Sequence, residues 1–80
     1  MTISNFRAYE PLYIVIVRSK QGEQTLRDWA KISNSQVTID GNRMQIFDVH
    51  TLNRFQMDWP GDWETVTIWD TWNKRHIWQD

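Results

Sequence analysis

Several stretches of the chain place apolar residues at strand-like spacing. Residues 12–17 form a continuous apolar run rich in β-branched side chains, which predicts a central strand covered on both faces. Residues 36–40 and 43–48 alternate apolar and polar positions on either side of a glycine turn, the pattern of a β-hairpin. Residues 64–70 alternate in the same way, and after a polar turn the chain returns over residues 75–79.

One stretch shows helical spacing. Over residues 25–32 the apolar side chains fall near one face and the charged ones face water; the apolar set is Leu26, Trp29, Ala30 and Ile32. A helix of about two turns needs packing against the sheet to persist. We therefore expect Trp29 to lie in the core.

Residues 49–59 fit two structures. As a helix, the segment begins after an Asp48 N-cap and carries an apolar stripe made of Val49, Leu52, Phe55 and Trp59. As a hairpin, residues 51–53 form the turn and the next strand alternates through Phe55, Met57 and Trp59. The helix would give the order β-α-β-β-α-β, the pattern of ferredoxin-like domains.

An apparent internal repeat favours the hairpin. Residues 45–48 (Gln-Ile-Phe-Asp) precede a polar turn and Phe55, and residues 67–70 (Thr-Ile-Trp-Asp) precede a polar turn and Ile77. Each copy of about a dozen residues locally resembles the final hairpin of a WD-type propeller blade, in which an apolar strand ends in Trp-Asp. The glycine-histidine element of those repeats is absent and 80 residues cannot build a propeller, so the resemblance implies a hairpin only.

These patterns predict a small α+β fold within a single domain spanning residues 1–80. We expect an antiparallel sheet of five or six strands, meander-like in its C-terminal half, with one short helix near residues 25–32. Residues 1–10 are expected to form an irregular arm. The ferredoxin-like β-α-β-β-α-β order is the alternative.

Composition narrows the class of protein. The chain has no cysteine, so no disulfide or cysteinyl metal site can stabilise it. Its start lacks the pattern of a signal peptide, and its longest apolar run is far shorter than the ~20 residues of a membrane span. We expect a cytoplasmic protein that does not bind membranes.

Catalytic and metal-binding patterns are scarce. The sequence contains no glycine-rich phosphate loop and no Gly-x-Ser-x-Gly motif. The two histidines, His50 and His76, have no carboxylate at a spacing that defines a metal site. We expect a protein that is not an enzyme and that has no cofactor or metal.

The strongest compositional feature is tryptophan. Five of the six tryptophans fall within the last 22 residues: Trp59, Trp63, Trp69, Trp72 and Trp78. Trp59 and Trp63 flank Pro60-Gly61-Asp62, where packing in the core or a turn is expected. One short helix covers a single sheet face, so exposed aromatic side chains on the other face would mark an interaction site.

The sequence therefore predicts a small protein-binding module, an inhibitor or adaptor that docks on a larger protein; modulators encoded by phages and plasmids are the analogy. Its contact residues would be tryptophan and arginine anchors within a charged rim, namely Trp69, Trp72, Trp78, Arg75, Lys74, Asp62, Glu64 and Asp70.

The alternative is single-stranded nucleic-acid binding, in which bases stack on the tryptophans beside Lys74 and Arg75. A net charge of −1, with six acidic and two basic residues over 40–70, makes nucleic acid the less favoured partner. A homodimer formed through the aromatic face is also compatible with the sequence.

Overall fold

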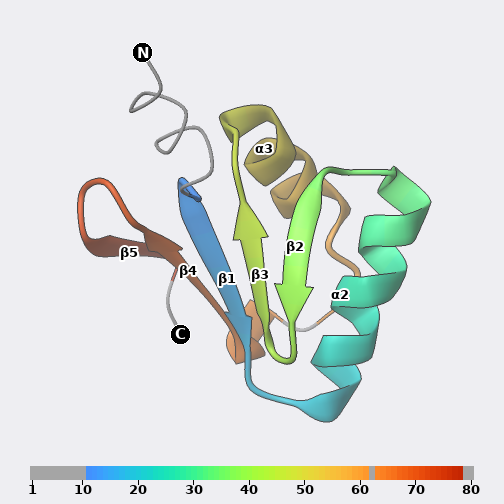
Figure 1. The fold of residues 1–80 in the computed structure, drawn as a ribbon. Helices are drawn as coiled ribbons and strands as arrows, with labels where there is room; N and C mark the ends of the chain where they lie inside the picture. Colours follow the sequence, from blue (N-terminus) through green and yellow to red (C-terminus); the bar gives the residue numbers. More distant parts are fainter. Residues whose placement is uncertain (1–10, 62, 79–80) are drawn as a thin grey trace.

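The computed structural model describes residues 11–61 and 63–78 and shows an α+β fold with five strands and two helices (Figure 1). Along the chain the elements are β1 (Tyr13–Val17), α2 (Lys20–Ser33), β2 (Val37–Asp40), β3 (Arg43–Ile46), α3 (Val49–Asp58), a 3-10 turn η1 (Trp63–Thr65), β4 (Val66–Asp70) and β5 (Arg75–Trp78). The predicted arm over residues 1–10 lies outside the described residues.

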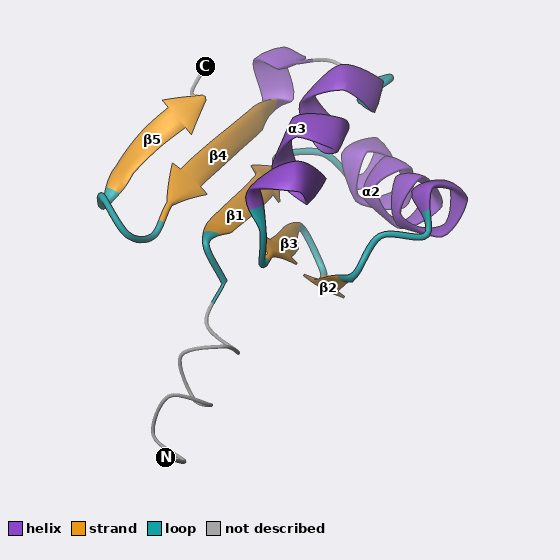
Figure 2. Ribbon diagram, turned by 90° about the horizontal axis from the view of Figure 1, so that it is seen from above, coloured by secondary structure: helices purple, strands orange, loops and turns teal. Residues whose placement is uncertain are grey.

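The five strands form one antiparallel sheet in the order β2-β3-β1-β4-β5. In the central strand β1, Val15 lies between Met44 of β3 and Ile68 of β4. Both helices pack on the same face of this sheet (Figure 2). The antiparallel sheet and the α+β class are as the sequence predicts.

The core lies between the sheet and the two helices. The sheet contributes fully buried aliphatic side chains from its three central strands, and the helices add a buried set comprising Leu26, Trp29, Leu52 and Phe55. The ring of Phe55 contacts three indoles, with centroid distances of 5.2 Å to Trp29, 5.0 Å to Trp59 and 5.8 Å to Trp63. Trp29 and Trp59 are core residues, as predicted.

Helix α2 begins earlier than the apolar spacing predicts. Ser19 is its N-cap: the backbone is extended there (φ −137°, ψ 156°), and its Oγ accepts a hydrogen bond from the Gly22 N–H at 2.9 Å. At the other end Asn34 adopts the left-handed conformation, with φ 55°, that ends many helices. Residues 20–24 lie outside the predicted helix and are helical because the Ser19 cap precedes them.

The prediction of a hairpin over residues 49–59 is wrong, because the structure has α3 there. The Asp48 carboxylate caps this helix by accepting hydrogen bonds from the Thr51 N–H at 2.7 Å and the Thr51 hydroxyl at 3.0 Å. The helical stripe buries Leu52, Phe55 and Trp59 together, whereas a strand would have divided its apolar residues between two faces. The fold therefore has two helices rather than one, and the meander is limited to the β4–β5 hairpin.

The structure also corrects the expectation that residues 12–17 are covered on both faces. Val15 and Val17 are fully buried on the helix side, whereas Ile14 and Ile16 point to the other face and are only half-buried. The two helices cover only one face of the sheet. Among the described residues no helix lies over the second face (Figure 2).

Candidate functional site

The sheet face opposite α2 and α3, called the helix-free face below, carries an apolar stripe. The β1 side chains alternate, so Ile14 and Ile16 share this face, and Leu12 lies just before the strand. Ile14 lies between Gln45 of β3 and Trp69 of β4 in the strand register. The aliphatic stripe and Trp69 are half-buried, so part of their apolar surface meets solvent.

Polar side chains surround this stripe. The Arg18 guanidinium, at the end of β1, donates hydrogen bonds to the Glu64 carbonyl oxygen at 2.9 Å and to the Thr67 hydroxyl at 3.3 Å. Thr67 is thereby buried although it lies on the helix-free face. At the β2–β3 hairpin, exposed Arg43 lies opposite exposed Asp40.

Trp69 joins this face to the last hairpin. In the register it lies opposite His76 of β5, and the two rings meet edge to face with centroids 4.8 Å apart. The pairing is irregular between Ile68 and Trp69, where the sheet contains a bulge. A bulge increases the local twist of a strand pair, and the β4–β5 hairpin turns away from the other strands (Figure 1).

The β4–β5 turn is built on the buried carboxylate of Asp70. Its Oδ1 accepts hydrogen bonds from the backbone N–H of Trp72 at 3.0 Å and of Asn73 at 3.1 Å, and its Oδ2 accepts one from the Asn73 side-chain amide at 2.8 Å. The bonds from Asn73, with smaller contributions from the Trp72 N–H and the Arg75 charge, hold the pKa of Asp70 below its ordinary value, against a smaller opposing effect of burial. The carboxylate is therefore a structural part of the turn.

The rest of the turn is exposed. Trp72 has 59% of its surface accessible, and Lys74 has a left-handed backbone with φ 54°. Lys74 and Arg75 are both exposed. The turn thus presents the Trp72 indole and two cations to solvent.

The structure brings together only some of the predicted contact residues. Trp69, Trp72, Lys74 and Arg75 lie in one hairpin, and Glu64 lies near the start of β4 beside Arg18. Trp78 is part of β5, where its backbone pairs with Ile68, and its side chain lies outside the described part of the chain. Asp62 also lies outside the described residues.

Sequence reasoning missed Ile14, Ile16, Arg18 and Arg43 as surface residues of this face. The signal that could have revealed the two isoleucines is the length of the apolar run, since a strand in a sheet covered on one side needs only alternate apolar positions. The arginines carry no pattern of their own. They lie near the stripe only because the strand register places them there.

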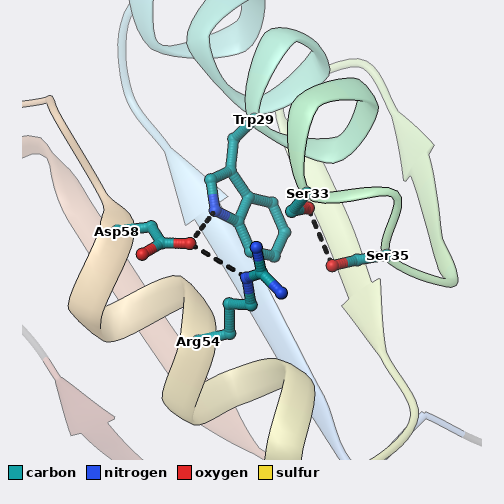
Figure 3. Close-up of polar contacts among 5 residues, drawn as sticks. All are labelled: Trp29, Ser33, Ser35, Arg54 and Asp58. Atoms are coloured by element: carbon teal, nitrogen blue, oxygen red, sulfur yellow. Dashed lines mark hydrogen bonds and ion pairs between the residues drawn. The ribbon is translucent and has the colours of Figure 1, made fainter.

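A hollow of about 430 Å³ lies between α2 and α3, with Trp29, Ile32 and Pro60 among its walls. At its edge the Trp29 Nε1–H donates to Asp58 Oδ2 at 3.4 Å, and Arg54 Nε donates to the same oxygen at 3.1 Å (Figure 3). The Ser33 and Ser35 hydroxyls, 2.7 Å apart, share a hydrogen bond nearby. The Trp29–Asp58 bond joins α2 to α3, which is a structural role, whereas the Arg54 contact lies within α3 and the serine contact lies at the end of α2.

A second hollow, of about 550 Å³, is lined by residues near the start of α2 and by Trp59, Pro60 and Gly61. The Trp59 indole N–H is buried without a hydrogen-bond partner. Gly61 packs closely against this indole. A Cβ atom at that position would lie only 2.9 Å from Nε1. Since Nε1 is sealed from solvent, a molecule in the hollow has no direct access to it.

The described residues contain no group of three or more metal-ligating side chains. His50 belongs to α3 and His76 to β5, on different elements. Neither of the two helices is long and apolar enough to cross a membrane, judged over the described residues.

Comparisons with known proteins yield no relative. No family model, curated protein sequence or solved structure matches this chain. Inference about function therefore starts from the chain's own surface chemistry.

Proposed function

We propose that this domain is a non-enzymatic protein-binding module. It docks the helix-free face and the adjoining β4–β5 hairpin on a larger protein, as an inhibitor or adaptor. The observation that carries the proposal is the partly exposed apolar stripe of Ile14, Ile16 and Trp69, over which no other described element packs. Contiguous apolar surface rimmed by polar residues is typical of protein interaction sites.

The stripe has the composition expected of an interface centre. Covering the exposed part of one isoleucine or tryptophan side chain stabilises a complex by on the order of 1 kcal/mol. Trp69 lies beside the aliphatic side chains, and tryptophan is enriched among the residues that dominate binding energy. The stripe therefore supports an apolar contact at the centre of the interface.

The charged rim favours an acidic partner. Among the described residues around the face and its hairpin, the exposed cations not held in a side-chain hydrogen bond are Arg43, Lys74 and Arg75, and the exposed carboxylates are Asp40 and Glu64. The chain as a whole has a net charge of −1, so this surface is basic relative to the rest of the molecule. Complementary charge would speed association and orient the partner.

A protein fits this face better than single-stranded nucleic acid does. Base stacking needs exposed aromatic faces, whereas the centre of the stripe is aliphatic and Trp69 already packs against His76. The Arg18 guanidinium is engaged by Glu64 and Thr67, which reduces its availability to phosphates. Nucleic acid is therefore an outcome for the experiment to exclude.

We further propose that the fold is ferredoxin-like with one added strand. The order β1-α2-β2-β3-α3-β4, the spatial order β2-β3-β1-β4 and the placement of both helices on one face support this assignment. β5 then extends the sheet at its β4 edge. A cysteine-free composition suits a reducing compartment, and we propose a cytoplasmic location.

The test is affinity capture from the native cell lysate with three forms of the tagged chain: wild type, Ile16→Lys and Ile32→Lys. Both variants exchange an isoleucine for a lysine. Ile16 lies on the helix-free face, whereas Ile32 is an exposed residue of α2. We expect a stoichiometric acidic protein to be retained by wild type and Ile32→Lys after nuclease treatment, and to be lost with Ile16→Lys.

Three results would overturn the proposal. Retained material that disappears with nuclease would assign the face to nucleic acid. Equal retention by all three forms would place binding elsewhere. Capture of the chain itself alone, with a dimer in sedimentation that Ile16→Lys abolishes, would make the face a homodimer contact.

A further inference from the structure

Trp72 is exposed, with 59% of its surface accessible, and its turn is held by several hydrogen bonds. We propose that Trp72 is a pre-organised anchor that inserts into an apolar pocket with an acidic rim on the partner protein. This inference rests on the proposed protein-binding function and adds to it the anchor residue and the chemistry of the partner's pocket.

Hydrogen bonds hold three successive residues of the turn that carries Trp72, namely Thr71, Trp72 and Asn73. Both backbone N–H groups at its tip, those of Trp72 and Asn73, are bound to the buried Asp70 carboxylate. The preceding residue, Thr71, ties the turn to the start of β1: its hydroxyl lies 2.7 Å from the Pro11 carbonyl oxygen, and its N–H donates to the Leu12 carbonyl oxygen at 3.1 Å. The backbone that positions the indole is thus fixed before any partner binds.

A fixed turn matters because association loses conformational freedom. Ordering a loop at an interface opposes binding, and a turn that is already ordered removes that loss. Tryptophan also has only two side-chain torsions, so it offers a large apolar area for little loss of rotamer freedom. The combination of a rigid turn and an exposed indole is typical of an anchor residue.

Other exposed apolar side chains lack this support. Ile32 and Met57 are each 84% accessible, but both project from the helices rather than from a hydrogen-bonded turn, and Ile32 lies at the edge of the hollow between α2 and α3. Isolated exposed apolar residues are ordinary on protein surfaces. Trp72 differs because its turn is hydrogen-bonded and directly follows β4, the strand that carries Trp69 of the helix-free face.

Charge specifies the pocket that would accept Trp72. Lys74 and Arg75 follow within three residues and are exposed, while the nearby Asp70 charge is turned inward to the turn. The outer surface of the tip is therefore an indole beside two cations. Its complement is an apolar pocket edged by carboxylates.

The test uses a photo-reactive benzoylphenylalanine placed at Trp72, at Ile16 or at Met57 in three versions of the full chain. Each is irradiated in nuclease-treated native lysate, and cross-linked peptides are sequenced. We expect one protein to be cross-linked from Trp72 and from Ile16 and not from Met57. The peptide joined to Trp72 should contain apolar residues flanked by aspartate or glutamate.

The outcomes separate this inference from the proposed function. Cross-linking from Ile16 without Trp72 would overturn the anchor and leave the face as the interface. Cross-linking from Trp72 to a basic or fully polar peptide would overturn the acidic-rimmed pocket. The same products from Met57 as from the other two sites, or no product from any, would overturn both proposals.

Whether the turn that carries Trp72 is already ordered in the free protein can be measured without a partner. In the free protein, amide hydrogen exchange at Trp72 and Asn73 should be slowed relative to an unstructured peptide, and Asp70→Ala, which removes the oxygen that accepts both N–H groups, should abolish that protection. Asn73→Ala removes the side-chain bond alone and should accelerate exchange less, which guards against a variant that simply unfolds. Unprotected amides at both positions in the wild-type chain would show that the turn is not pre-formed.

Discussion

At the scale of single residues, the space around Trp59 shows how closely the aromatic core is filled. The indole is buried against Phe55 and Trp63, with ring centroids 5.0 and 6.4 Å away. Gly61 closes over its edge, where only a residue without a Cβ fits. Close packing of this kind makes small changes of volume costly.

Gly61→Ala tests this packing. The added Cβ would lie 2.6 Å from Cζ2 of Trp59, so either the indole or the turn must shift. We expect a loss of about 1–3 kcal/mol in the free energy of unfolding, measured by chemical denaturation. Gly41→Ala is the contrast: its Cβ meets nothing within 4 Å, but φ is +62° there.

The contrast separates clash from backbone strain. Asparagine tolerates the left-handed region, so Gly41→Asn should recover most of the stability that Gly41→Ala loses. Gly61→Asn should not recover any, because the steric conflict with Trp59 is unchanged. Wild-type stability in Gly61→Ala would show that the indole is loosely held.

Asp70 gives the molecule a pH-dependent element. Its pKa is lower in the folded chain than the ordinary aspartate value, so the charged form favours the folded state. That stabilisation is fully present above the ordinary aspartate pKa and is lost as pH falls through the lower folded pKa. At pH values below about 4, we expect the free energy of unfolding of the wild type to decrease, in part because Asp70 becomes protonated.

Asp70→Asn should be less stable than wild type at pH 7, since the amide cannot accept the Asn73 side-chain bond and carries no charge. The difference between the two chains should narrow as pH falls through the titration of Asp70. Thermal unfolding at pH 7, 4 and 2.5 measures this. A difference that is constant over the range would contradict the assignment.

At the scale of elements, α3 decides the architecture. Its formation leaves the sheet with two helices on one face and places Phe55 at the centre of the aromatic cluster. The prediction of a hairpin over residues 49–59 rested on the local similarity between residues 45–57 and the last hairpin. The helical stripe and the Asp48 cap are present in the same sequence. The burial of Leu52 and Phe55 against the sheet explains why the helix forms instead of the hairpin.

Asp48→Ala tests the cap of α3. Losing the two bonds to Thr51 should lower the free energy of unfolding by about 0.5–2 kcal/mol. Asp40→Ala, which removes an exposed aspartate from β2, should change it by less than about 0.5 kcal/mol. Equal effects of the two substitutions, in urea denaturation, would argue that Asp48 does not act as a cap.

At the scale of the whole molecule, local patterns predicted the strands well. The hairpin at Gly41, the alternation of Val66 and Ile68 and the central apolar strand all follow from short-range spacing. The helix-free face could not be predicted in the same way. It is made by the register that sets Ile14 beside Trp69, 55 positions away in the sequence, and such long-range pairing is invisible to periodicity.

The measurement that tests the account most directly is the dissociation constant of the captured partner for Ile16→Lys and for Ile32→Lys, after thermal unfolding has shown that both variants are folded. The account predicts that Ile16→Lys weakens binding by at least about thirtyfold, the range of an interface hot spot, while Ile32→Lys stays within about twofold of wild type. Equal dissociation constants for the two variants would contradict the assignment of the helix-free face as the binding surface.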